Sequence, residues 1–173
     1  MKKNLFLLVV ACFSMFSTNA LAQEKNEVQD VDFSSYGLYY AADFEAPGEG
    51  SIMFLGQVFP LSISRLGFEF GVGWTMSTFD TSDGVDGACV FKIGPAYVLP
   101  INRNFFVTTS LTFLCSAYSD DDDDWKFNPG ASFAPRLGCK MGRVILTGGL
   151  DFMYMKGVDE IGTCFSVGLA MDL

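Results

Sequence analysis

Residues 66–77 (LGFEFGVGWTMS) constrain the fold of this chain more than any other stretch. Large apolar residues occupy every second position, while the positions between them hold glycine, small polar residues and Glu69. A period of two places the two sets on opposite faces of a β-strand. A soluble barrel points its bulky side chains inward, whereas here the small set suits the concave side. The bulky set then needs an apolar solvent outside the barrel, which favours lipid.

The same alternation recurs in further segments, each near the length that a tilted strand needs to cross a bilayer. These segments are 35–44, 51–61, 88–99, 105–118, 130–140, 144–155 and 163–173. Unpaired first and last strands would present long apolar edges, and pairing them with each other removes both edges. We therefore predict an all-β fold over residues 34–173: a closed, eight-stranded, antiparallel, up-and-down transmembrane β-barrel.

Two prolines interrupt this pattern. Pro95 and Pro135 fall inside segments that a closed barrel pairs on both sides, and proline removes one hydrogen bond from a strand ladder. We expect a bulge or a local break in the sheet at each of them.

The N-terminus predicts an export signal over residues 1–22. Two lysines precede a long apolar core, and a small-x-small site follows it, so we expect cleavage between Ala22 and Gln23. An uncleaved anchor and a lipoprotein signal ending at Cys12 are the alternatives. Residues 23–33 are polar and charged, which predicts a periplasmic lead-in to the barrel.

The connections between the segments alternate in length and in charge. The first, third, fifth and seventh are longer and rich in aspartate and glutamate. The second, fourth and sixth are short, and they contain Arg65, Arg103 and Arg143 but no acid. Outer-membrane barrels have long extracellular loops and short periplasmic turns. We therefore expect acidic extracellular loops, with the N- and C-termini on the periplasmic side of the cell outer membrane.

The composition argues against several functions. The chain has no histidine, which removes His-based triads and the commonest zinc ligand. Its formal charge of −9 argues against nucleic acid as a partner. The sequence also contains no convincing nucleophile–base pair, so we expect neither an enzyme nor a bound cofactor.

Four charged residues fall on the predicted inner face, each in a different segment: Glu69, Lys92, Arg136 and Asp151. The interior of an eight-stranded barrel is just wide enough for side chains to fill, so opposite charges there must pair. We favour a structural plug of ion pairs, which Lys140 could join near the periplasmic rim. A gated, narrow ion path is the alternative.

An acidic run lies in the fifth connection, and it consists of Asp120, Asp121, Asp122, Asp123 and Asp124. Oxygen ligands suit Ca²⁺ or Mg²⁺, but the spacing lacks the glycine and the distal glutamate of an EF-hand loop. We favour a solvated, self-repelling loop. A divalent-cation site, or cations bridging the loop to lipopolysaccharide phosphates, are the alternatives, and no metal centre is expected elsewhere.

Four cysteines follow the predicted signal, and none of them has CxxC spacing. Cys89, Cys115 and Cys139 fall on the predicted outer face, where they suit small lipid-facing positions. Cys89 and Cys115 lie near the loop end of adjacent segments. A disulfide between them is therefore left open as a further hypothesis.

Together these features resemble a known family. The export signal, the eight alternating segments, the run Gly-Pro-Ala-Tyr-Val-Leu-Pro at 94–100 and the alternating terminal segment resemble small OmpA/OmpX-type outer-membrane β-barrels, also described as porin-like. The terminal segment departs from the family pattern by ending in Leu173, where an aromatic residue is more usual. The resemblance implies contact with outer-membrane lipid and lipopolysaccharide, and with the barrel-assembly machinery during biogenesis.

The function that we predict is an integral outer-membrane barrel with a side-chain-filled lumen and short acidic extracellular loops, in a structural or interaction role. A narrow ion or small-solute channel is the first alternative. A soluble, periplasmic, lipocalin-like carrier is the second, and it requires the bulky faces to point inward. The sequence predicts no particular protein partner.

Overall fold

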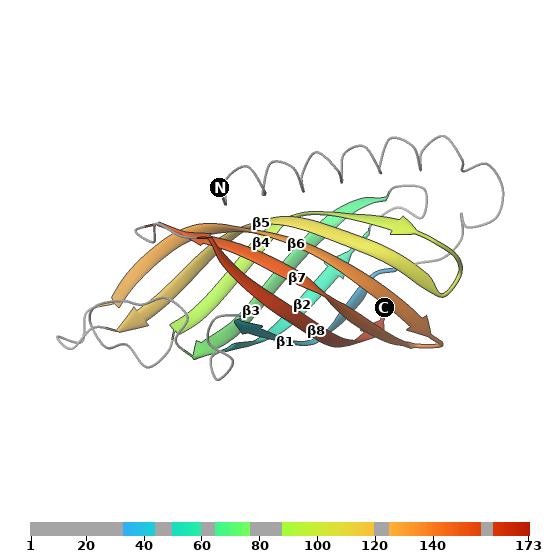
Figure 1. Cartoon of the computed structure of the whole chain (residues 1–173), viewed down its shortest axis with the longest axis horizontal. Helices are drawn as coiled ribbons and strands as arrows, with labels where there is room; N and C mark the ends of the chain where they lie inside the picture. Colours follow the sequence, from blue (N-terminus) through green and yellow to red (C-terminus); the bar gives the residue numbers. More distant parts are fainter. Residues whose placement is uncertain (1–32, 44–49, 60–64, 77–87, 120–124, 157–160) are drawn as a thin grey trace.

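The computed structural model is a closed barrel of eight antiparallel strands (Figure 1). It describes residues 33–43, 50–59, 65–76, 88–119, 125–156 and 161–173. The strands are β1 (Ser35–Asp43), β2 (Gly50–Val58), β3 (Leu66–Met76), β4 (Ala88–Pro100), β5 (Phe105–Ser119), β6 (Trp125–Met141), β7 (Val144–Met155) and β8 (Gly162–Asp172). Each strand pairs with its neighbours in sequence, and β1 pairs with β8 to close the sheet. The predicted closed, up-and-down fold is therefore confirmed.

One predicted boundary is wrong: β6 begins at Trp125, whereas the sequence predicted a loop that ended at Pro129. The hairpin of β5 and β6 continues to the pair Ser119–Trp125. Pro129 is compatible with this strand because the pairing of β6 with β7 starts only at Gly130. The missing N–H of Pro129 therefore removes no bond from that ladder.

The prolines inside β4 and β6 produce local breaks but no bulge. The pairing of β4 with β5 is interrupted at Pro95 and resumes in the same register at Ala96. The pairing of β6 with β7 is interrupted in the same way at Pro135. Each proline keeps its pairing on the other side, with Phe68 and Thr109 respectively. The prediction of a bulge or a break is thus confirmed as a break.

The two faces of the wall have opposite character. Along β3, Phe68 and Trp74 on the outer face are 60% and 54% exposed, whereas Glu69 on the inner face is 0% exposed. Serine and threonine dominate the buried polar residues of β5, which include Thr108, Ser110, Thr112 and Ser116. The bulky apolar faces therefore point outward, which contradicts the requirement of the lipocalin-like alternative.

The short turns, the start of β1 and the end of β8 lie at the same end of the barrel. The N–H of Leu173 donates to the carbonyl of Ser34 (3.1 Å), and the N–H of Asp172 donates to the carbonyl of Arg143 (2.9 Å). Arg143 belongs to the tight turn between β6 and β7, where Gly142 adopts a φ of 65°. Such a left-handed conformation favours glycine.

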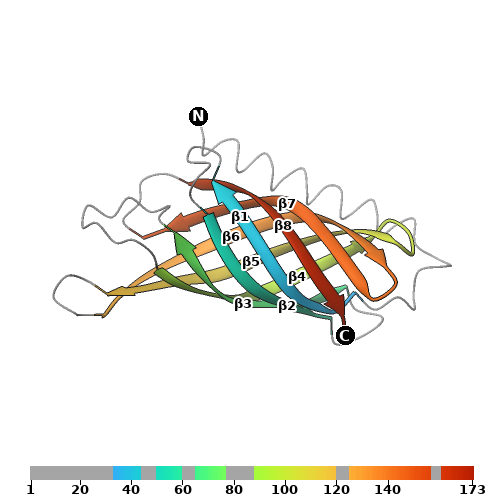
Figure 2. The ribbon, with the colours of Figure 1, turned by 90° about the horizontal axis from the view of Figure 1, so that it is seen from below.

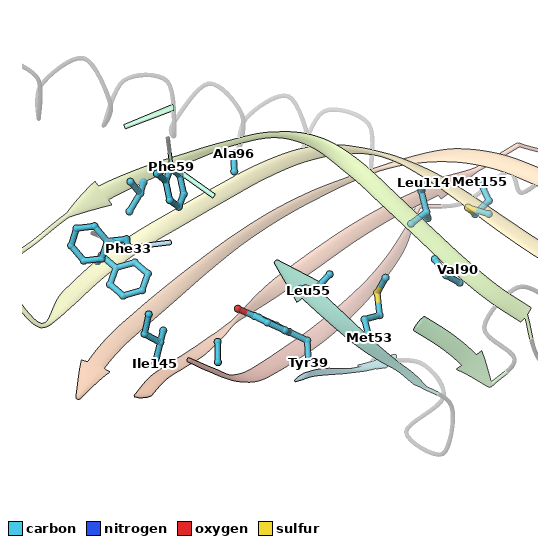
Figure 3. Packing of buried hydrophobic residues seen from close by; sticks show 13 residues of the cluster. Phe33, Tyr39, Met53, Leu55, Phe59, Val90, Ala96, Leu114, Ile145 and Met155 are labelled. Atoms are coloured by element: carbon cyan, nitrogen blue, oxygen red, sulfur yellow. The ribbon is translucent and has the colours of Figure 1, made fainter. Parts of the chain in front are cut away.

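Apolar side chains fill the lumen in two groups (Figure 3). The group at the short-turn end includes Phe33, Phe59 and Ile145, and the ring of Phe33 lies 4.7 Å from that of Phe106. The second group gathers around Val90, Leu114 and Met155, with Tyr39 and Leu55 between the two groups. Both ends of the lumen are therefore lined by packed hydrocarbon.

Within the described residues, no helix has the length and apolar character needed to cross a membrane.

Candidate functional site

The four charged residues predicted for the lumen converge on one cluster. Glu69 comes from β3, Lys92 from β4, Arg136 from β6 and Asp151 from β7. All four are buried, with exposed fractions of 5% or less. The strand alternation places each side chain inward, and the closure of the barrel brings these strands to face one another across the lumen. We call these four residues the lumen cluster.

Arg136 occupies the centre of the lumen cluster. Its Nη2 lies 3.0 Å from both carboxylate oxygens of Asp151, and its Nη1 lies 2.7 Å from Oε2 of Glu69. The planar guanidinium can hold two carboxylates at once because its donors diverge in a fixed fork. One side chain thereby links two strands that are far apart in the barrel wall.

Lys92 completes the charge balance. Its Nζ lies 2.9 Å from Oε1 of Glu69 and 3.7 Å from Oδ2 of Asp151. Two cations therefore alternate with two carboxylates, and the lumen cluster carries no net formal charge. Burial of ions is costly unless each is paired and hydrogen-bonded, so this neutrality is what makes the cluster tolerable.

Three neutral side chains extend the cluster, and the sequence did not identify them. Nε2 of Gln57 donates to Oε2 of Glu69 at 2.7 Å, and Oγ of Ser166 donates to Oδ1 of Asp151 at 3.1 Å. The guanidinium carbon of Arg136 lies 5.3 Å from the centre of the Tyr39 ring, in the range of a cation–π contact. Their inward positions in the strand alternation were the available signal, although the alternation is least regular in segment 51–61, which contains Gln57.

Glycines beside the cluster leave room for its long side chains. A Cβ added at Gly149 would lie 2.9 Å from Cγ of Arg136, and one added at Gly71 would lie 3.3 Å from Cγ of Lys92. Both glycines fall on the inner face of their strands. The small set of the alternation therefore provides the volume that the charged residues occupy.

Lys140 does not join the lumen cluster. Its Nζ lies 2.8 Å from Oδ2 of Asp172 at the short-turn end, and both side chains are partly exposed. The prediction that Lys140 could extend the central network is therefore replaced by a separate rim ion pair. Lys140 and Asp172 occupy the ends of β6 and β8, which the linear sequence does not bring together.

Two of the remaining predicted sites lie outside the described residues. They are the acidic run 120–124 and the cleavage site after residue 22. Across the described ranges, no group of three or more metal-ligating side chains occurs.

The four cysteines of the described residues are free in the structure: Cys89, Cys115, Cys139 and Cys164. Cys115 lies opposite Phe91, while Cys89 lies opposite Ala117. The hypothesised Cys89–Cys115 disulfide is thus not formed, because diagonal neighbours are farther apart than a disulfide allows.

The fold and the lumen cluster define the class: a small closed barrel with an apolar outer wall and an ion-paired interior. Solved structures with this fold include the N-terminal β-barrel domain of Pseudomonas aeruginosa OprF. The TM-score is 0.56 at 9% identity, and the match covers 81% of this chain and 96% of that chain. Neisserial surface protein A (NspA) matches with a TM-score of 0.53 at 11% identity, over 81% of this chain and 94% of that chain.

These likenesses confirm, at the level of the fold, the predicted resemblance to small OmpA/OmpX-type barrels. No protein-family model matches the sequence, and no curated protein sequence matches it.

Proposed function

We propose that this chain is an integral outer-membrane β-barrel with a side-chain-filled lumen, and that it has a structural or interaction role. The observation that carries the proposal is the inverted polarity of the wall: large apolar side chains are exposed outside, and paired charges are buried inside. An apolar outer band is what a lipid bilayer requires of a spanning barrel. The likeness to the OprF barrel domain and to NspA supports the same assignment.

The lumen supports a plug in preference to an open pore. The lumen cluster is neutral and directly paired, and packed apolar groups lie toward both ends of the barrel. An ion crossing the lumen would have to displace both the lumen cluster and the packed apolar groups. We therefore propose a non-enzymatic barrel whose acidic connections, expected on the extracellular side, present its interaction surface.

The experiment that tests the membrane assignment is gel migration of the protein from washed outer membranes, with and without boiling. A folded closed barrel resists SDS until it is heated, so we expect a heat-dependent shift in the membrane fraction. A protein that is recovered as a soluble species without a shift would overturn the proposal.

The narrow channel is tested separately, in planar bilayers. The plug predicts no stepwise conductance from the refolded wild-type barrel. Reproducible steps that change in size when Lys92 is replaced by methionine would establish a conducting path through the lumen cluster instead.

We also propose that the surroundings of the barrel include outer-membrane lipid and lipopolysaccharide, and that the barrel-assembly machinery inserts it. The acidic run 120–124 suggests cation bridges to lipopolysaccharide phosphates, because carboxylates and phosphates both coordinate Ca²⁺ and Mg²⁺. EDTA should then lower the unfolding temperature of the barrel in lipopolysaccharide-containing vesicles. An unchanged temperature would remove the cation bridge from the proposal.

A further inference from the structure

The short-turn end of the barrel carries a set of arginines that the plug does not explain. Each short connection contributes one of them: Arg65 precedes β3, Arg103 lies between β4 and β5, and Arg143 lies between β6 and β7. Arg103 and Arg143 are exposed, and the ion pairs among the described residues engage neither of them. We call these three residues the arginine rim.

The described residues supply a single acid close to the arginine rim. This acid is Asp172, and its Oδ2 lies 2.8 Å from Nζ of Lys140, so the two charges cancel. Residues 60–64, which precede Arg65, contain no charged side chain. The short-turn end therefore has an excess of positive charge, and a partner of opposite charge would be attracted to it.

The arginine rim surrounds a closed floor. The rings of Phe33 and Phe106 lie 4.7 Å apart, and both residues pack with Phe59 and Ile145 in the lumen at this end (Figure 3). All four are buried. An anionic partner therefore has no path into the lumen and would lie across the mouth of the barrel.

The chain itself enters the barrel at this floor. The N–H of Phe59 donates to Oγ of Ser34 (3.0 Å), and the N–H of Leu173 donates to the carbonyl of Ser34 (3.1 Å), so the start of β1 is fixed at the short-turn end, where β1, β8 and the C-terminus lie together in Figure 2. The lead-in 23–32 directly precedes this anchor and contains four acids and one lysine. Its net charge is thus −3, and its ten residues can extend over roughly 33 Å.

We propose that the arginine rim binds the acidic lead-in 23–32 of the same chain, which then covers the short-turn mouth. The three positive charges of the rim match the net charge of the lead-in. Exposed ion pairs are individually weak, but attachment at Phe33 gives the lead-in a high effective concentration at the rim. The contact goes beyond the proposed function, because it does not depend on which side of the membrane the short turns face. It leaves the loop end of the barrel for other partners.

The test is photo-crosslinking in the full chain, with a benzophenone amino acid introduced at Val28 within the lead-in. In washed outer membranes, we expect crosslinks to peptides that contain Arg65, Arg103 or Arg143, as identified by mass spectrometry. The crosslink yield of the refolded barrel should fall at high salt, because salt screens exposed charges.

Charge variants test the arginine rim directly. The triple variant Arg65→Gln, Arg103→Gln and Arg143→Gln should lower the yield by about five-fold or more, because three weak ion pairs are lost together. Arg143→Gln alone should give a smaller loss. Lys156→Gln is the matched control, because Lys156 is equally exposed and follows β7 at the end opposite Arg143.

The lead-in is tested in the same way. Neutralising its acids with Glu27→Gln, Asp30→Asn and Asp32→Asn should lower the yield as much as the triple arginine variant does. The heat-dependent gel shift is measured for every variant. A failure to form the proposed barrel is thereby distinguished from a loss of the contact between the lead-in and the rim.

Three outcomes would overturn the contact. One is a wild-type crosslink to another envelope protein or to lipid in place of the short turns, which would assign the lead-in to a different partner. Another is an unchanged yield in the triple arginine variant. The third is an equal loss in Lys156→Gln and Arg143→Gln, which would indicate a diffuse effect of net charge.

Discussion

The inner and outer walls of the barrel are built from alternate residues of the same strands, yet they obey opposite rules. Phe68 and Glu69 are neighbours in the chain, yet Phe68 is 60% exposed while Glu69 is 0% exposed. In a soluble protein both positions would be unfavourable. Here the outer solvent is proposed to be hydrocarbon, and the carboxylate has Lys92, Arg136 and Gln57 as partners.

The difference shows where the structural specificity of this barrel resides. Lipid tails are as apolar as leucine, so an outward side chain gains little from being one apolar residue rather than another. An inward side chain must fit a closed space and satisfy fixed partners. We therefore expect the inner wall to be sensitive to small changes, and the outer wall to be sensitive mainly to polarity.

The largest expected effect comes from Arg136→Ala. It removes one of the two buried cations that Glu69 and Asp151 share and leaves a net negative charge in the lumen, so the free energy of unfolding should fall by about 3–5 kcal/mol. Urea unfolding in lipid vesicles, followed by tryptophan fluorescence, measures this loss. Arg136→Lys should give an intermediate loss because an ammonium cannot form the same fork. The exposed Arg143→Gln is the control, and an equal effect in both would contradict a specific role for the lumen cluster.

The next effect concerns the outer wall. Leu111 lies near the middle of β5, on the outer face, and is 57% exposed. Leu111→Arg should cost about 2–4 kcal/mol in a bilayer, because a cation near the midplane of the membrane is poorly solvated. The same change at Ile101, in the short turn, should cost about 0–1 kcal/mol because it lies near the interface. Equal costs at the two positions in the vesicle unfolding assay would contradict the proposed membrane band.

The smallest expected change in stability concerns two adjacent glycines of β7. Gly149→Ala places a Cβ against the backbone of β6 and 2.9 Å from Cγ of Arg136, so it should cost about 1–3 kcal/mol through overpacking. A Cβ added at Gly148 would make only an ordinary van der Waals contact, with the carbonyl oxygen of Ser166 at 3.9 Å, so Gly148→Ala should change the stability little. The same unfolding assay measures both, and the reverse order would show that the two faces of β7 are wrongly assigned.

Much of the fold could be predicted from local alternation alone. A side chain in a strand points to the face opposite that of its neighbour, and this rule needs no knowledge of the partner strand. Glu69, Lys92, Arg136 and Asp151 were therefore placed inside the barrel from their spacing. The start of β6 was missed because Pro129 resembles a turn signal. Only the pairing of the strands shows that its missing N–H removes no ladder bond.

The sequence by itself determined the number of strands, their inner and outer faces and the closure of the sheet, because these follow from short-range periodicity and from the cost of open edges. The tertiary structure alone decided which charges meet. Arg136 bridges Glu69 and Asp151, while Lys140 pairs with Asp172 at the rim. These contacts depend on the register and tilt of the strands around a closed barrel, and every strand pairing contributes to them at once.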